Sequence, residues 1–285
     1  MKILVTGVNG QLGYDVIRRL EVLSKEIENL EFTGVDIKDF DLTDYEETRN
    51  YITNYRPDVI VHCAAYTAVD RAEDETDLCF RVNVTGTENI AKVCREIDAK
   101  LIYISTDYVF SNAGDTPHNI DDEKSPINYY GETKLLGENK VKELVDKYFI
   151  VRTSWVFGVN GSNFVKNMLK LGSEKDEISV VADQVGSPTY TVDLAVLLCE
   201  MLFTEKYGTY HATNEGYCSW YEFACEIFRI AKIEVEVVSV SSEEYITKAK
   251  RSKNSRLSKK SLNDNGFNRL PNWKVALTQY ISTIK

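Results

Sequence analysis

The sequence predicts an α/β fold, a doubly wound parallel sheet with a smaller, interleaved α/β region toward the C-terminus. Three observations support this prediction. Short apolar runs alternate with segments of helical spacing along the first half of the chain. These runs are rich in β-branched residues and lack polar alternation, which is typical of strands covered on both faces. A glycine-rich turn at residues 7–13 joins the first apolar run to the first helical segment.

In the first half, predicted strands and helices follow one another regularly. The run Ile-Leu-Val-Thr at 3–6 predicts a strand, and apolar residues at helical spacing predict a helix over 12–23. A helix over 45–55 ends before Pro57, because the residue before a proline disfavours helical geometry. By the same criteria we expect strands at 31–36, 59–64, 101–105 and 149–152, and helices at 84–97 and 130–148.

The second half is less regular and contains no repeat, low-complexity tract or linker. We therefore expect two closely packed domains with the ligand between them. The first spans 1–157, with part of 185–212 returning to it, and the second spans 158–285. Helices are predicted at 164–171, 192–203, 220–231 and 273–284, and strands at 178–181, 208–211 and 235–240.

Composition narrows the class of partner. The chain has 285 residues, of which 43% are hydrophobic, so it can bury a substantial core. Its formal net charge of −10 argues against nucleic acid and anionic membranes as partners. One dense basic run, at 250–256, fits either a solvated loop or a contact with a diphosphate.

Cysteine and histidine usage bears on compartment and metals. The 6 cysteines form no Cys-x-x-Cys pair, which indicates reduced thiols and a cytoplasmic protein. The 3 histidines are isolated and show no metal-ligand spacing, so we predict no metal site. No signal peptide is expected, and no apolar stretch approaches the roughly 20 residues of a membrane span.

The glycine-rich turn predicts a dinucleotide site. Gly7, Gly10 and Gly13 would let the backbone approach a pyrophosphate at a helix N-terminus, although three glycines also fit an ordinary turn. Asp36 favours the first interpretation, because a carboxylate about 20 residues further on binds the ribose hydroxyls. Since a carboxylate also repels a 2′-phosphate, Asp36 favours NADH over NADPH, with Lys38 close enough to weaken that preference.

A tyrosine, a lysine and a threonine predict hydride-transfer chemistry. Tyr130 and Lys134 lie four residues apart and share a helix face. We expect the ammonium to lower the pKa of the phenol, which is about 10 when unperturbed. Thr106, at a strand end, would hold a carbonyl oxygen that Tyr130 protonates while reduced nicotinamide gives hydride. Tyr-x-x-x-Lys also occurs by chance. The neighbouring Tyr129 lacks the ammonium, because Thr133 is its partner.

Six strings along nearly the whole chain form a wider pattern. They are Gly-Val-Asn-Gly-Gln-Leu-Gly at 7–13, His-Cys-Ala-Ala-Tyr-Thr-Ala-Val-Asp at 62–70, Ser-Thr-Asp-Tyr-Val-Phe at 105–110, Tyr-Gly-Glu-Thr-Lys at 130–134, Arg-Thr-Ser-Trp-Val-Phe-Gly at 152–158 and Asp-Gln-Val-Gly-Ser-Pro-Thr at 183–189. With them the chain resembles the dTDP-4-dehydrorhamnose reductase family of the extended short-chain dehydrogenases/reductases. The resemblance implies a Rossmann-like fold, NADH or NADPH, and reduction of the C4 ketone of dTDP-4-dehydro-β-L-rhamnose. Where the family usually has proline near the C-terminus, this chain has Ser252.

The resemblance also implies roles for individual residues. The catalytic set is Thr106, Tyr130 and Lys134, of which Tyr130 and Lys134 also bind the cofactor. The other expected cofactor-binding residues are Gly7, Gly10, Gln11, Leu12, Gly13, Asp36, Asp41, Leu42, Ala64, Ala65, Tyr66 and Thr67. The expected contacts to the dTDP-sugar substrate are Thr106, Asp107, Trp155, Asn163, Gln184 and Thr189.

Two alternatives remain open. One is another sugar-nucleotide reductase or epimerase of the same superfamily, and the other is a non-catalytic regulatory subunit on the same fold. Retention of the catalytic set argues against a regulatory subunit. Tyr108 stands where a dehydratase needs a carboxylate beside Asp107, and no added acid–base pair suggests an epimerase. The resemblance allows a homodimer, but Asp15 is the only carboxylate that matches its metal-bridged form, so no metal is predicted.

Overall fold

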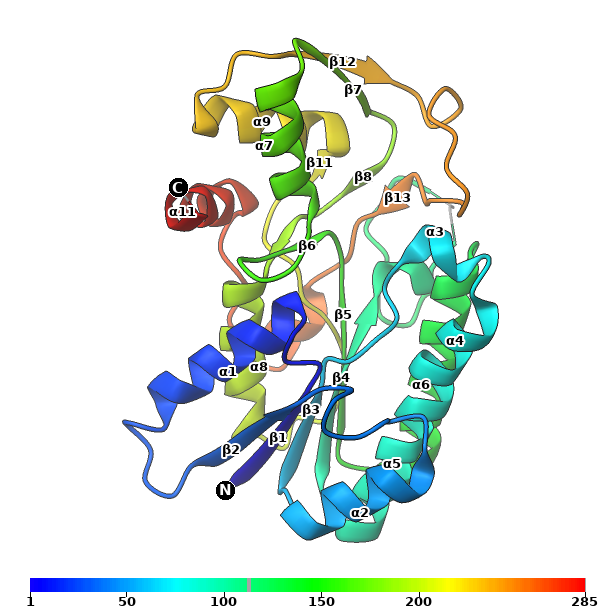
Figure 1. Cartoon of the computed structure of the whole chain (residues 1–285), viewed down its shortest axis with the longest axis vertical. Helices are drawn as coiled ribbons and strands as arrows, with labels where there is room; N and C mark the ends of the chain where they lie inside the picture. Colours follow the sequence, from blue (N-terminus) through cyan, green and yellow to red (C-terminus); the bar gives the residue numbers. More distant parts are fainter. Residues whose placement is uncertain (112–113, 285) are drawn as a thin grey trace.

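The structure, a computed structural model, describes residues 1–111 and 114–284. A central parallel sheet carries helices on both faces and lies below a smaller α/β region (Figure 1). The 6 strands follow the order β2-β1-β3-β4-β5-β10, and every pairing is parallel. The predicted doubly wound α/β fold is confirmed. The strands are β1 (Lys2–Thr6), β2 (Glu31–Val35), β3 (Val59–His62), β4 (Lys100–Thr106), β5 (Tyr148–Thr153) and β10 (Gly208–His211).

The first strand shows why this sheet is apolar on both faces. Ile3 and Val5 pack into a core with the helices on one face, whereas Leu4 packs into a separate core on the other face. All three side chains are fully buried, so no polar alternation is possible. Helices α1 (Gln11–Leu23) and α8 (Thr191–Leu202) cover the first face, and α2 (Tyr45–Tyr55), α5 (Thr87–Ile97) and α6 (Tyr129–Leu144) cover the second.

Four predicted boundaries differ from the structure by more than one residue, and one of them is the helix predicted over 164–171, which continues to Glu174. The strand predicted over 59–64 ends at His62, where the chain leaves the sheet as an irregular loop. The helix predicted over 130–148 ends at Leu144, because the buried Val145 is extended (φ −127°, ψ 122°) and a bend of two residues then precedes β5. The helix predicted over 84–97 continues from a π-helix, η1 (Arg81–Gly86), which sequence periodicity does not reveal.

Part of the C-terminal half returns to the sheet. Strand β10 pairs with β5, and α8 packs against α1 in the same core. Leu262, Phe267 and Leu270 also enter this core, although the predicted division assigned them to the second domain. Their burial makes the first domain larger than the sequence indicated.

The smaller region lies beyond the carboxyl ends of the sheet strands (Figure 1). Its core joins aromatic and aliphatic side chains of three helices, α7 (Phe164–Glu174), α9 (Trp220–Ala231) and α11 (Trp273–Ile284), to the parallel pair β7 (Glu177–Val181) and β12 (Glu236–Val240). Short segments complete the junction: α3 (Val69–Ala72), α4 (Thr76–Phe80), the 3₁₀ turn η2 (Asp107–Val109), β6 (Val156–Phe157), β8 (Val185–Gly186), β9 (Thr189–Tyr190), β11 (Cys218–Ser219), β13 (Asn254–Ser255) and α10 (Lys260–Asp264).

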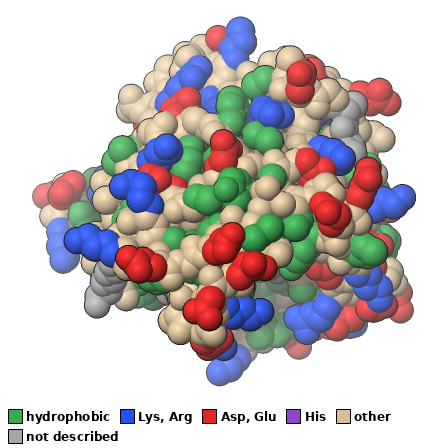
Figure 2. All heavy atoms as spheres, turned by 90° about the horizontal axis from the view of Figure 1, so that it is seen from above, with side chains coloured by type: hydrophobic (Ala, Val, Ile, Leu, Met, Phe, Trp, Pro, Cys, Tyr) green, Lys and Arg blue, Asp and Glu red, His purple; other side chains and the backbone are tan. Residues whose placement is uncertain are grey.

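The surface carries both signs of charge. Seen from above, basic and acidic side chains are interspersed with apolar ones on the visible face (Figure 2). Within the described residues, no helix is both long and apolar enough to cross a membrane.

Candidate active site

A cavity of about 900 Å³ lies at the carboxyl ends of the sheet strands. It surrounds the end of β1, where the strand order reverses because β2 and β3 lie on opposite sides of β1. Ligands of open parallel sheets bind at such a switch point. Every residue predicted to bind the cofactor lines this cavity: Gly7, Gly10, Gln11, Leu12, Gly13, Asp36, Asp41, Leu42, Ala64, Ala65, Tyr66, Thr67, Tyr130 and Lys134.

The glycine turn is shaped by close backbone contacts. Gly7 has a φ of +70°, and a Cβ there would lie 2.6 Å from the backbone nitrogen of Ala64. A Cβ on Gly13 would lie 2.3 Å from the carbonyl oxygen of Gly7. Glycine is therefore required at both positions. Gly10 caps α1 without a side-chain hydrogen bond, so the amides of the first helical turn remain available to a pyrophosphate.

Asp36 follows β2 and is held by the backbone. Its carboxylate accepts hydrogen bonds from the amides of Asn9, at 3.0 Å, and Ile37, at 2.8 Å. The first of these bonds ties Asp36 to the glycine turn. The remaining lone pairs of the carboxylate can accept hydrogen bonds from a ribose at the cavity wall.

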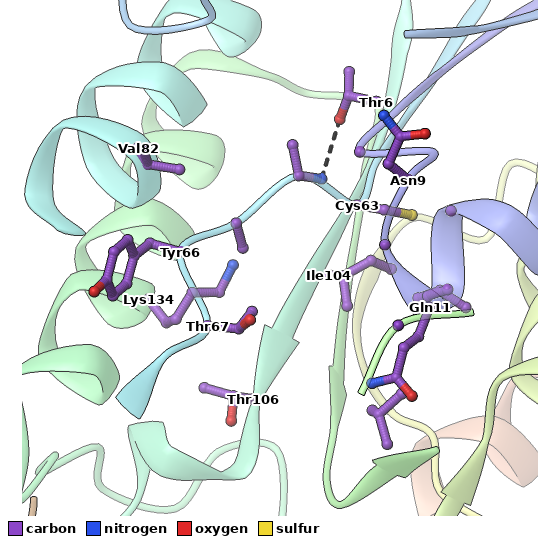
Figure 3. A pocket seen from close by; sticks show the side chains of 18 of the residues that line it. Thr6, Asn9, Gln11, Cys63, Tyr66, Thr67, Val82, Ile104, Thr106 and Lys134 are labelled. Atoms are coloured by element: carbon purple, nitrogen blue, oxygen red, sulfur yellow. Dashed lines mark hydrogen bonds between the residues drawn. The ribbon is translucent and has the colours of Figure 1, made fainter. Parts of the chain in front are cut away.

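Helix α6 brings Tyr130 and Lys134 to the cavity. Asn128 caps the helix by accepting a hydrogen bond from the amide of Gly131 at 2.8 Å, which starts the helix one residue before Tyr130. Tyr130 is 8% exposed and Lys134 is 2% exposed. The ammonium of Lys134 lies 4.1 Å from the centre of the Tyr103 ring. Figure 3 shows Lys134 extending from α6 into the pocket near Thr67.

The expected lowering of the Tyr130 pKa is not observed. Burial raises the pKa of the phenol, the negative charge of Asp107 raises it further, and a hydrogen bond with Thr106 opposes both. Burial also lowers the pKa of Lys134 to about 7, against the opposing charge of Glu138. The sequence argument counted the lysine charge and omitted desolvation, which dominates for both groups. Tyr130 therefore stays protonated in the neutral pH range, as a proton donor must.

Thr106 ends β4 and Asp107 begins η2, beside Tyr130. The hydroxyl of Thr106 donates to the carboxylate of Asp107 at 3.0 Å and accepts from the amide of Tyr108 at 3.2 Å. Burial raises the pKa of Asp107 to about 6, while hydrogen bonds from Ser255 and Thr106 oppose the shift. Both predicted residues line the cavity, so the junction of β4 and η2 presents a hydroxyl and a carboxyl group next to the phenol.

The remaining predicted substrate contacts divide into two groups. Trp155 lines the cavity with a φ of +50° and stacks on Trp220 at 3.6 Å between ring centres. The other three do not line it. Asn163 caps α7 by accepting from Lys166, and its amide nitrogen donates to Gln11. Gln184 donates to Ser242, and Thr189 is fully buried at the β6–β9 pairing.

Two of the four basic side chains of the run at 250–256 are paired with carboxylates of the same chain. Arg251 forms two hydrogen bonds to the Asp70 carboxylate, at 2.6 and 3.0 Å. Lys253 lies 2.9 Å from Asp183. Part of the run forms β13, which pairs with β8. Through the contact between Arg251 and Asp70, this segment connects the smaller region to α3.

A metal site is not apparent in the part of the chain that the structure describes. Residues 1–111 and 114–284 contain no cluster of three or more potential His, Cys, Asp or Glu ligands. Asp15, the one carboxylate that matched the metal-bridged dimers, is buried and accepts a hydrogen bond from Thr191 of the same chain.

Comparison with known proteins identifies the family. The family model described as RmlD substrate binding domain matches residues 1–285. The chain belongs to this family. Spore coat polysaccharide biosynthesis protein SpsK of Bacillus subtilis (strain 168) is 40% identical over 98% of this chain and 96% of its own length. A dTDP-4-dehydrorhamnose reductase of Escherichia coli (strain K12) is 36% identical over 100% of this chain and 98% of its own.

Solved structures agree with this assignment. The dTDP-4-dehydrorhamnose reductase from Bacillus anthracis str. Ames, in complex with NADP, has 44% identity and a TM-score of 0.93. The match covers 99% of each chain. The RmlD-family assignment therefore rests on sequence and fold together.

Sequence reasoning missed several cavity residues of this RmlD-family chain. Tyr108 lines the cavity with its ring 5.7 Å from that of Tyr130, edge to face. Its place directly after Asp107 could have indicated this position. Leu78 and Val82 line the cavity from α4 and η1. Their four-residue spacing indicates only a helix face, so nothing local pointed to a site.

Proposed function

We propose that this chain reduces the C4 ketone of dTDP-4-dehydro-β-L-rhamnose to dTDP-β-L-rhamnose with a nicotinamide cofactor, the last step of dTDP-L-rhamnose synthesis. One observation carries the proposal: the glycine turn, Thr106, Tyr130 and Lys134 line one cavity. Full-length similarity to reductases named for this substrate supports the sugar nucleotide chosen.

The proposed chemistry assigns one task to each side chain. A bound, reduced nicotinamide would supply the hydride that the carbonyl carbon accepts. Tyr130, whose raised pKa keeps its proton in place, donates that proton to the carbonyl oxygen. Thr106 orients this oxygen from the end of β4. Lys134 binds the nicotinamide ribose and stabilises the phenolate that remains after proton transfer.

We propose NADH as the preferred cofactor. The carboxylates of Asp36 and Asp41 line the adenosine end of the cavity, and Lys134, far from that end, is the one basic residue among the described lining residues. A 2′-phosphate would therefore meet negative charge without a lining cation. The B. anthracis relative was solved with NADP, so the preference requires direct measurement.

Other contacts and the setting complete the proposal. We propose that Asp107 and Trp155 contact the sugar nucleotide from the cavity wall. Asn163, Gln184 and Thr189 would support that wall from behind. The homodimer and the cytoplasmic location stay predictions.

The test is cofactor oxidation with the unstable ketone generated in place. The chain is mixed with dTDP-4-dehydro-6-deoxyglucose, a 3,5-epimerase, and NADH or NADPH. Epimerase-dependent oxidation with dTDP-L-rhamnose as product supports the proposal. NADH binding without oxidation would favour another sugar nucleotide, and capture of one stoichiometric partner enzyme without turnover would favour a regulatory subunit.

A matched pair of tyrosine variants tests the assigned proton donor. We expect Tyr130→Phe to retain NADH binding and lose turnover by about 10²–10⁴-fold, the usual contribution of general acid catalysis. Tyr129→Phe, one residue earlier on the same helix, should stay near wild type. Turnover of Tyr130→Phe close to that of Tyr129→Phe would refute the assignment.

A further inference from the structure

Three buried polar side chains, His62, Asn83 and Thr87, lie behind the cavity wall, and a fourth, Thr6, lines the cavity; none takes part in the proposed chemistry. Thr6 ends β1, His62 ends β3, Asn83 belongs to η1 and Thr87 begins α5. Each is at most 2% exposed. Buried polar atoms of this kind need hydrogen-bond partners. The direction of their bonds therefore reports what they hold in place.

The tautomer of His62 follows from counting hydrogens. Thr87 Oγ1 lies 2.8 Å from the carbonyl oxygen of Asn83, which can only accept, so Thr87 donates its single hydrogen there. His62 Nε2, 3.2 Å from Thr87 Oγ1, must then carry the hydrogen of that contact. Burial lowers the pKa of His62 to about 3, so the ring is neutral and Nδ1 is an acceptor. Thr6 Oγ1 donates to Nδ1 at 2.8 Å.

Both ends of this chain of bonds reach the same loop. Thr6 Oγ1 accepts from the amide of Ala64 at 3.2 Å, the bond dashed in Figure 3. The side chain of Asn83 accepts from the amide of Tyr66 at 2.8 Å and donates to its carbonyl oxygen at 3.1 Å. The path closes through covalent bonds, from the carbonyl group of Asn83 to its own side chain and along the backbone from Tyr66 to Ala64. We call this set the polar ring: Thr6, His62, Thr87, Asn83, Tyr66 and Ala64.

The polar ring fixes a segment that has no regular structure of its own. Residues 63–68 belong to neither a helix nor a strand. Side chains therefore make the hydrogen bonds to its backbone that neighbouring strands or helical turns make in regular structure. Ala64, Ala65 and Tyr66 line the cavity beside the glycine turn, and Gly7 already approaches Ala64 too closely to admit a Cβ. A shift of the Ala64 backbone would consequently move the cofactor wall.

We propose that His62 is a positioning residue, whose neutral ring joins Thr6 to Thr87 as the Nε2–H tautomer and holds the backbone of 64–66 in the conformation the cofactor requires. His62 is not among the cavity-lining residues, so it acts through Thr6 and Ala64. The inference rests on the proposed location of the cofactor. The bonds from the Ala64 amide through Thr6, His62 and Thr87 to the Asn83 carbonyl run in one direction, and aligned bonds of this kind reinforce one another.

Three substitutions separate the two halves of the ring. In His62→Asn the amide oxygen can replace Nδ1 and accept from Thr6. In His62→Gln the longer amide can replace Nε2 and donate to Thr87, but the Thr6 contact is lost. His62→Leu removes both contacts. All three remove the aromatic ring, so losses of packing are shared among them.

Equilibrium binding of NADH, followed by its fluorescence, is the deciding measurement. We expect His62→Gln and His62→Leu to weaken binding about fivefold, the effect of one buried hydrogen bond, and His62→Asn to stay within about twofold of wild type. The kcat at saturating NADH and the KM for the sugar nucleotide should change little. Equal NADH affinity in all three variants would overturn the inference, whereas failure of the wild-type chain to bind NADH would overturn the cofactor site itself.

Nitrogen NMR of the wild-type chain tests the tautomer without any ligand. Long-range proton–nitrogen correlations of His62 should show a neutral ring with its hydrogen on Nε2 throughout the neutral pH range. Hydrogen on Nδ1, or titration within that range, would contradict the direction of bonds in the polar ring.

Discussion

Two cations are buried beside the same helix, and only one has an anionic partner. Arg152 is 0% exposed and donates two hydrogen bonds to Glu138, each of 2.7 Å. Lys134 is 2% exposed and lies one turn before Glu138 on α6. Among the described residues, no carboxylate lies within ion-pair distance of Lys134, and its ammonium faces the Tyr103 ring.

The pKa shifts show what this difference means. Arg152 holds the pKa of the Glu138 carboxyl below its usual value although burial opposes the shift. Burial lowers the pKa of Lys134 to about 7 because nothing fixed nearby compensates it fully. A buried charge without a protein partner carries a desolvation cost that a ligand can offset. The contrast supports a structural role for Arg152 and the proposed role of Lys134 in binding the cofactor.

The largest expected effect comes from breaking the paired cation. Glu138→Gln leaves Arg152 buried without a counter-charge and should lower the free energy of unfolding by about 3–5 kcal/mol. Urea denaturation at neutral pH measures this loss. The double variant Glu138→Leu with Arg152→Met should lose less than the sum of the two single variants, because no charge remains unpaired. Additive losses would show that the pair is not coupled.

Removing the unpaired cation, Lys134, should lower activity without lowering stability. Lys134→Met retains the length of the side chain and should lower kcat by about 10²–10³-fold, the cost of one electrostatic group at the reacting atoms. The free energy of unfolding should stay equal or rise, because a buried ammonium is removed. Lys140→Met, on the exposed face of the same helix, is the control. A Lys134→Met variant that is less stable yet fully active would contradict the prediction, because Lys134 would then have a structural role like that of Arg152.

The lowered pKa of Lys134 predicts a pH dependence with a defined sign. A group with a pKa of about 7 is charged below that pH and neutral above it. If catalysis needs the ammonium, kcat/KM for NADH should be constant below about 7 and fall tenfold per pH unit above it. Lys134→Met should lack this limb. Asp107, with a pKa of about 6, titrates at lower pH and can be separated with Asp107→Asn.

The smallest effect concerns the anionic side of the same cavity. Asp36→Asn should raise the KM for NADH and lower that for NADPH, changing the ratio of their kcat/KM values by about fivefold. Removing the carboxylate relieves repulsion of the 2′-phosphate but retains side-chain size. Asp39→Asn is the control, because Asp39 accepts from the amide of Asp36 at 2.8 Å without lining the cavity. An equal change of this ratio in both variants would indicate an effect of the overall negative charge rather than contact between Asp36 and the ribose.

Local patterns predicted the parts of the site that depend on short spacing. The glycine turn, Asp36 and the Tyr130–Lys134 pair are each set by one strand end or one helix face, and all line the cavity. Asn163, Gln184 and Thr189 were predicted from resemblance alone, and the structure uses them in caps and packing. A sequence motif does not specify which side chains of a loop point toward a ligand.

The parallel sheet, its covering helices and the residues of the predicted cofactor site could be predicted from the sequence. This is because β-branched runs, helical spacing and glycine geometry act over a few residues. Tertiary structure decided the rest. Pairing of β10 with β5, the Arg152–Glu138 contact and the polar ring around His62 join segments far apart in the chain. The tyrosine pKa depends on burial in the same way. Such features depend on which groups desolvate one another after folding, and no local spacing encodes that.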